Sequence, residues 1–121
     1  MDINKAIADL KSEPGFADNV GMILVHNGVV RGWSRSSDHA AVTGIEIAAD
    51  LDKVEEIRKE IEAREGVWRA VAQANSGRMK PGDDVLLLIV AGDIRENVKP
   101  ALADFLDRVK AEAFTKREIL A

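Results

Sequence analysis

The last thirty residues of the chain, Gly92–Ala121, carry the side chains best suited to chemistry. Three cations there lie off an apolar helical stripe: Arg95 in the first turn of the expected helix, Lys110 in its last turn, and Lys116 just beyond its end. A cation in a first turn opposes the helix dipole, so Arg95 needs another reason for its position, such as an anion or a carboxylate partner. Arg offers phosphate a pair of parallel hydrogen bonds. Lys offers a mobile charge that can move protons or form a covalent adduct when it is desolvated.

A further cation, Arg31, ends an expected strand beside Gly32 and Trp33. Metal chemistry has little support, because His26 and His39 lack a second ligand at metal spacing. We therefore expect no metal and no bound cofactor. The chain has no Cys, which excludes disulfides, thiolate metal sites and a Cys nucleophile, and which fits a reducing compartment such as the cytoplasm.

The bulk composition limits the class of protein. With 121 residues, of which 46% are hydrophobic and 31% charged, the chain is expected to form one domain spanning residues 1–121. Its net charge of -4 does not favour wrapping nucleic acid. The longest apolar run, Val85–Ala91, is too short to cross a bilayer, and no signal peptide is recognisable. We expect a cytoplasmic protein that binds neither membrane nor nucleic acid.

The periodicity of apolar residues predicts an α+β fold. Helices are expected where apolar residues recur three or four positions apart, and strands where short apolar runs lie between turn residues. In order, the chain predicts a helix at 3–10, a strand at 20–25 that Gly28 interrupts and that resumes at 29–30, a strand at 42–48, a helix at 51–64, strands at 67–72 and 85–90, and a closing helix from about residue 93. Because helices alternate only partly with strands, we expect a mixed sheet with the helices packed on one side.

Local signals refine this outline. Asp52 and Asp93 each precede a Glu by three residues, the spacing of a helix capping box. Pro100 lies inside the closing helix and should kink it or delay its regular start. The polar segment 34–39 is expected to be a mobile loop, and Lys80–Asp83 a tight turn.

Three pieces of the chain, spread over residues 19–118, together resemble the large, catalytic subunit of molybdopterin synthase. Their order and spacing carry the resemblance more than any single motif does. The pieces are Gly21-x6-Gly28-Val29-Val30-Arg31; Ser76-Gly77-Arg78-Met79-Lys80-Pro81-Gly82-Asp83 before an apolar strand; and Arg95 with Lys110 fifteen residues on, followed by Phe114-Thr115-Lys116-Arg117-Glu118.

The resemblance implies a fold of the α/β-hammerhead type and a sulfur-transfer reaction in molybdenum cofactor biosynthesis. In that family, a ubiquitin-like small subunit inserts its C-terminal Gly-Gly thiocarboxylate into the large subunit, and its sulfur passes to cyclic pyranopterin monophosphate. The large subunits dimerise within a heterotetramer. Carried over to this chain, Lys110 and Lys116 would be the catalytic lysines, and Arg31 and Arg95 would bind the anionic groups of the substrate.

Two alternatives remain open. This chain has Ile94 where the family has His, and Ala74-Asn75 where the family has His-Arg. These departures would suit a divergent relative that acts as a binding or scaffold dimer without catalysis. A small α+β dimer of another family that senses an anionic metabolite would also fit the order of elements, though not the spacing of the motifs.

Overall fold

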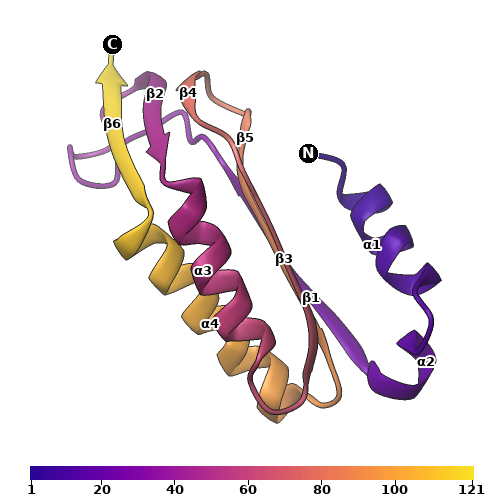
Figure 1. Ribbon diagram of the computed structural model, residues 1–121. Coiled ribbons are helices and arrows are strands. Elements are labelled where there is room, and N and C mark those ends of the chain that lie inside the picture. Colours follow the sequence, from indigo (N-terminus) through magenta and orange to yellow (C-terminus); the bar gives the residue numbers. More distant parts are fainter.

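The computed structural model describes residues 1–121 as two three-stranded antiparallel sheets with helices packed around the longer one (Figure 1). The first sheet has the strand order β1-β5-β3 and the second β4-β2-β6. None of the helices combines the length and the apolarity needed to cross a membrane. The elements, in chain order, are α1 (Ile3–Ser12), α2 (Phe16–Asn19), β1 (Met22–Val29), β2 (Val42–Ala49), α3 (Leu51–Glu62), β3 (Val67–Ala74), β4 (Gly77–Met79), β5 (Asp84–Gly92), α4 (Arg95–Glu112) and β6 (Phe114–Leu120).

The core lies between the first sheet and the pair α3–α4, which cover one of its faces (Figure 1). β5 is the central strand, and its residues Leu86–Ala91 are almost completely buried, as the continuous apolar run predicts. Its even-numbered side chains pack against α3 and α4, where Phe105 is the largest fully buried residue. The predicted α+β class, with its two long helices on one side, is confirmed. Every strand pair is antiparallel, so neither sheet is mixed.

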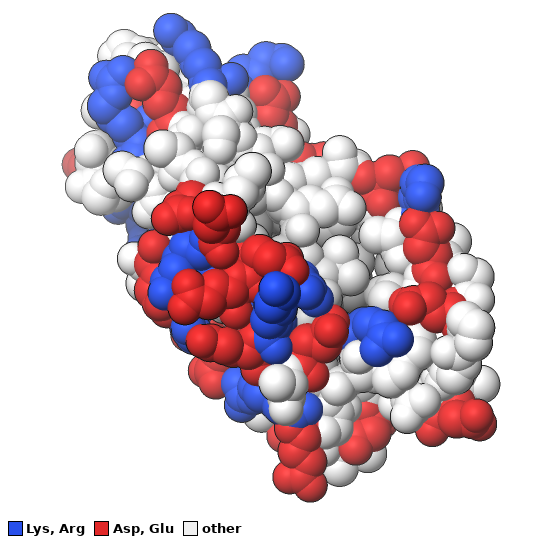
Figure 2. All heavy atoms as spheres, in the orientation of Figure 1, with Lys and Arg blue, Asp and Glu red and all other residues white.

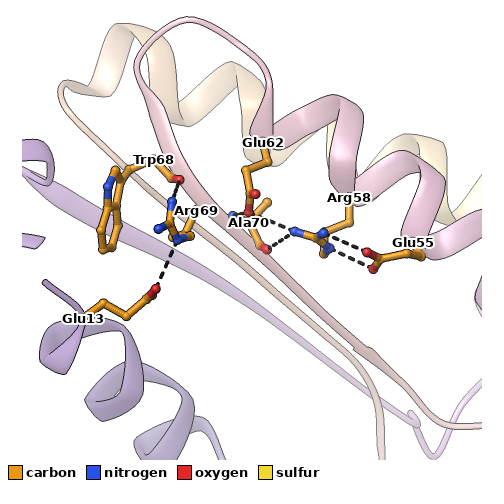
Figure 3. Close-up of polar contacts among 7 residues, drawn as sticks. All are labelled: Glu13, Glu55, Arg58, Glu62, Trp68, Arg69 and Ala70. Carbon is orange, nitrogen blue, oxygen red and sulfur yellow. Dashed lines mark hydrogen bonds and ion pairs between the residues drawn. The ribbon is translucent and has the colours of Figure 1, made fainter. Parts of the chain in front are cut away.

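A partly buried ion pair within α3 is hydrogen-bonded to the backbone of β3 (Figure 3). Arg58 makes two parallel hydrogen bonds to Glu55, with N–O distances of 2.8 and 2.7 Å. It also donates to Glu62 at 2.9 Å and to the Ala70 carbonyl at 3.2 Å. Glu62 in turn accepts the Ala70 backbone N–H at 2.9 Å. The side chains thus hold the helix at a fixed position along the strand.

The short helix α1 packs on the opposite face of the first sheet (Figure 1). Its Leu10 is buried against the odd-numbered side chains of β5. Beyond its end, Glu13 accepts a hydrogen bond of 3.2 Å from Arg69 of β3, whose guanidinium lies 4.2 Å from the centre of the Trp68 ring (Figure 3). The first helix is therefore fastened to the sheet by apolar contact and by one ion pair.

The second sheet contains the two strands that the sequence does not predict. β4 has only three residues, too few for a periodic signal. β6 pairs with β2, and it escapes prediction because it is an edge strand whose exposed side chains are mostly polar. In the first sheet, β1 runs through Gly28 without interruption, with a register shift between Gly28 and Val29.

The capping signals are displaced by one or two residues. α3 begins after Asp50, whose carboxylate accepts the Lys53 N–H, so Asp52 lies within the first turn. α4 begins after Ile94, which offers no side-chain cap. The Asp93 carboxylate instead accepts hydrogen bonds from the Ile94 N–H and the Asn97 side chain. The helix runs through Pro100, so the proline does not delay its start.

Candidate functional site

One cavity of about 230 Å³ lies where the two sheets meet the end of α4. Its walls come from β1 and the residues after it, β2, β5, α4 and β6. About half of the lining is apolar, and three cations, one histidine and one carboxylate are set into it. The lining residues are His26, Gly28, Val29, Val30, Arg31, Ile45, Ile47, Val85, Leu86, Lys110, Phe114, Lys116 and Glu118.

Lys116 reaches the cavity because it lies on a strand. Side chains alternate between the two faces of a strand, and in β6 this places Lys116 and Glu118 on the cavity side. Lys116 pairs in register with Ile47 of β2. Its neighbour Arg117 faces the other way and forms an ion pair of 2.7 Å with Glu46. Two adjacent cations thus have different surroundings.

Lys110 enters the same cavity from the last turn of α4. Its neighbours along the chain explain the direction. Val109 and Ala113 are buried in the core, which fixes the orientation of the helix end. The exposed Lys110 side chain therefore lies at the cavity. The Ala113 carbonyl also accepts the Asp50 N–H at 2.8 Å, which ties this end of α4 to the start of α3.

Arg31 is positioned by the turn Lys80–Asp83. The backbone of Val30 both donates to Asp83 and accepts from Gly82, with distances of 3.0 and 2.9 Å. Gly82 has φ of +92°, which a residue without Cβ adopts easily. The predicted turn therefore fixes the end of β1. The Arg31 guanidinium then lies 4.6 Å from the centre of the Trp33 ring.

The three cavity cations have no carboxylate partner. None of Arg31, Lys110 and Lys116 forms an ion pair. The one carboxylate in the cavity, that of Glu118, instead accepts a hydrogen bond of 2.7 Å from Ser34. Ser34 is fully buried and also accepts the Ser37 N–H, so Glu118 is held to the loop 34–39.

Arg95, the fourth predicted site residue, lies elsewhere in this chain. It opens α4, fifteen residues before Lys110, which is about 22 Å along a helix. Its side chain is 76% exposed and pairs with Glu96 at 3.3 Å. The expected convergence of all four cations on one cleft is therefore wrong within a single chain. The unfavourable position of Arg95 relative to the helix dipole is offset by the neighbouring Glu96 carboxylate.

His26 also lines the cavity, although the sequence predicted no role for it there. It lies on β1, and its Nε2 atom is buried without a hydrogen-bond partner. Burial, and to a smaller extent the charge of Lys110, lowers the pKa of His26 below its usual 6.5. The alternation of side chains along β1 could have pointed to His26. It lies on the same face of the strand as Met22 and Leu24, which pack against the core.

Residues 1–112 match the family model described as MoaE protein. The chain belongs to the MoaE protein family. Members of this family are the large, catalytic subunits of molybdopterin synthase, the sulfur-transferring enzyme of molybdenum cofactor biosynthesis. The resemblance read from the three sequence pieces is thereby confirmed. A comparison with curated proteins found no significant match.

Solved structures of MoaE-type proteins share the fold. Molybdopterin cofactor biosynthesis protein E from Burkholderia multivorans superposes with a TM-score of 0.75 at 21% identity, over 100% of this chain and 85% of that one. Molybdopterin synthase from Staphylococcus aureus gives 0.71 at 22% identity, over 84% and 76%. A complex of subunits 1 and 2 of the molybdopterin-converting factor from Helicobacter pylori gives 0.70 at 18% identity, over 98% and 80%.

Proposed function

We propose that the cavity is the sulfur-transfer site of this MoaE family member. The site receives the C-terminal Gly-Gly thiocarboxylate of a ubiquitin-like small subunit and a cyclic pyranopterin monophosphate. The thiocarboxylate sulfur forms a carbon–sulfur bond on the pterin as an oxygen substituent leaves that carbon. Water then cleaves the bond between the sulfur and the acyl carbon, so the small subunit leaves with a terminal carboxylate. Lys116 and Lys110 are the catalytic residues, and Arg31 binds an anionic group of the substrate.

The observation that carries this proposal is the set of three unpaired cations in one cavity. A thiocarboxylate and a phosphate ester are both anions, so a site for them needs fixed positive charge. Surface cations usually lie near carboxylates, and such pairs add little stability. Cations that gather without a carboxylate partner repel one another, and a bound anion relieves that repulsion. The apolar half of the wall suits the uncharged part of a ligand.

The lysines and the arginine suit different tasks. Arg31, backed by Trp33, has a planar fork that holds a phosphate or carboxylate in one orientation. Lys110 and Lys116 are exposed at the cavity, so their amines reach a ligand. A lysine brought close to two other cations and shielded by a ligand can transfer a proton or form a transient amide with the carbonyl of the small subunit.

The assembly follows from the same proposal. A small-subunit partner is supported by the Helicobacter pylori complex of two subunits, which shares this fold. We further propose a homodimer of this chain within a heterotetramer, a cytoplasmic location, and a single domain over residues 1–121. The role of Arg95 in anion binding stays a prediction.

Reconstitution tests the proposal directly. The purified chain is mixed with a thiocarboxylated small subunit from the same cell and with cyclic pyranopterin monophosphate, and the oxidised, fluorescent product of molybdopterin is measured. Lys116→Ala should abolish the product. Arg117→Ala is the matched control, because its side chain is adjacent on β6 but faces away from the cavity. Full activity of Lys116→Ala would refute the assignment.

A binding or scaffold function is the second candidate. It is favoured by Ile94, whose side chain is 53% exposed at the start of α4 and offers no polar group there. Under this alternative the chain would form the complex with the small subunit yet yield no product. Product that depends on Lys116 would exclude it.

A further inference from the structure

His26 is a polar side chain of the cavity to which the sulfur-transfer scheme assigns no role. It lies on the wall formed by β1, and the cavity that it lines also contains Lys110, Lys116 and Arg31. Its Nε2 atom is buried and has no hydrogen-bond partner. A buried polar atom without a partner costs free energy, so it calls for an explanation.

The surroundings offer Nε2 nothing to bond. The next residue on the same face of β1 is Gly28, where an added Cβ would lie 3.1 Å from Nε2. The absence of a side chain at Gly28 therefore leaves room for the imidazole ring. β5 contributes only the apolar Val85 and Leu86 to this cavity.

The charged groups that face the cavity are mostly positive. Lys110 comes from α4, Lys116 and Glu118 come from β6, and Arg31 follows β1. Glu118 is engaged by Ser34 at 2.7 Å. A proton added to His26 would place a fourth cation beside three others. An oxyanion bound in the cavity would instead attract the proton and favour the charged imidazolium.

We propose that His26 is a proton-linked contact for an oxyanion of the ligand: it is neutral in the free protein and, when an oxyanion enters, takes up a proton from solvent and donates a hydrogen bond from Nε2. The inference rests on the proposed function, because it concerns the same cavity. The shared chemistry is a phosphate or carboxylate oxygen. Its source is either the pterin phosphate or the terminal carboxyl group of the small subunit.

The charges around His26 set the sign of the linkage between anion binding and protonation. In the free protein, burial and the nearby Lys110 lower the pKa of His26. A bound anion favours the imidazolium, so binding raises that pKa and the affinity for the anion increases as the pH falls. A rise of one pKa unit corresponds to a tenfold gain in affinity across the titration of His26.

The test follows the imidazole resonance of His26 by NMR, with and without sulfate, which does not itself titrate in this range. A parallel arm uses a peptide that ends in Gly-Gly with a free carboxylate. We expect the pKa of His26 to rise by about one unit or more in at least one arm. Calorimetry in buffers of different ionisation enthalpy should show uptake of up to about one proton per site. The arm that produces the shift identifies the source of the oxyanion.

Variants separate this inference from the proposed function. His26→Phe and His26→Gln should retain anion binding at pH 8 and lose its increase toward pH 6. His39→Gln, which alters a histidine stacked on Trp33 outside the cavity, should keep that increase. An anion that binds without moving the His26 resonance or taking up a proton overturns the inference, as does failure of both anions to bind. Turnover that depends on Lys116 in the reconstituted enzyme would then leave the proposed function standing.

Discussion

The surface of α3 and α4 and the cavity beside β6 both carry cations, but only on the helices are most of the cations paired with carboxylates. Blue and red spheres are interleaved over the two helices (Figure 2). The paired cations there are Lys53, Arg58, Arg95 and Arg108, together with Arg64 just after α3, each within 3.5 Å of a carboxylate. The cavity cations have no such partner, although the chain has more acidic than basic residues, 21 against 17.

The difference separates two uses of positive charge. Where a cation is paired within the fold, its removal leaves a carboxylate unpaired and weakens the structure. Where a cation is left unpaired beside others, its removal lowers repulsion, and the loss appears in binding or catalysis. Substitutions in the two regions should therefore affect different measurements.

After the complete loss of product expected for Lys116→Ala, the largest effect is expected at Lys110. Lys110→Ala should lower the rate of product formation about 10²–10⁴-fold, the usual contribution of a positioned proton-transfer group, because the cavity loses one of its two amines. Single-turnover kinetics with saturating small subunit would measure it. Lys99→Ala is the control, since Lys99 is an exposed, unpaired lysine of the same helix outside the cavity. Equal loss in both variants would contradict a specific role for Lys110.

Arg58 and Lys110 should differ in their effect on stability. Arg58→Met removes bonds to two carboxylates and to the Ala70 carbonyl, and it should lower the free energy of unfolding by about 1–3 kcal/mol. Lys110→Met, which breaks no ion pair, should change it by no more than about 0.5 kcal/mol. Urea denaturation of both variants measures this contrast. A larger loss for Lys110→Met than for Arg58→Met would reverse the comparison.

Ser34 tests whether Glu118 must be kept away from the cavity cations. Ser34→Ala deletes the 2.7 Å hydrogen bond to Glu118 and should cost about 1 kcal/mol of stability. The freed carboxylate would then compete for Lys116 or Arg31 and weaken sulfate binding. Calorimetric titration measures the second effect. If Ser34→Ala loses stability but binds sulfate as the wild type does, the hydrogen bond serves only to hold the loop.

The smallest effect is the pH dependence that His26 adds to stability in anion-free buffer. Its pKa is lowered in the folded state relative to about 6.5 in the unfolded chain. The unfolded chain therefore binds more protons in that window, so stability is highest above pH 6.5 and falls as the pH falls through the folded pKa. Denaturation midpoints between pH 5 and 7.5 should fall less steeply in His26→Phe than in the wild type. Identical profiles would show that His26 is not the titrating group.

Much of the first sheet and its helices could be predicted from local pattern. The apolar run 85–90 reads as a central strand because a strand buried on both faces needs apolar residues at every position. The helical stripes that cover it are equally local. Cap positions shifted because Asp50 competes with Asp52, and Asp93 bonds Asn97 in preference to closing a capping box. Which side chain caps a helix depends on the backbone conformation of the residues just before its first turn.

The sequence by itself determined the family, the central strand, the long helices and the turn 80–83, and it singled out all three cations that line the cavity. The pairing of β6 with β2 was decided only by the tertiary structure, since an edge strand with polar side chains has no periodic apolar signal. That pairing directs Lys116 inward and Arg117 outward. Arg95 lies fifteen positions before Lys110, and because α4 is continuous between them, Arg95 is held at the far end of the helix from the cavity. His26 joined the cavity because the alternation of β1 places it beside the end of α4, a contact between segments far apart in the chain.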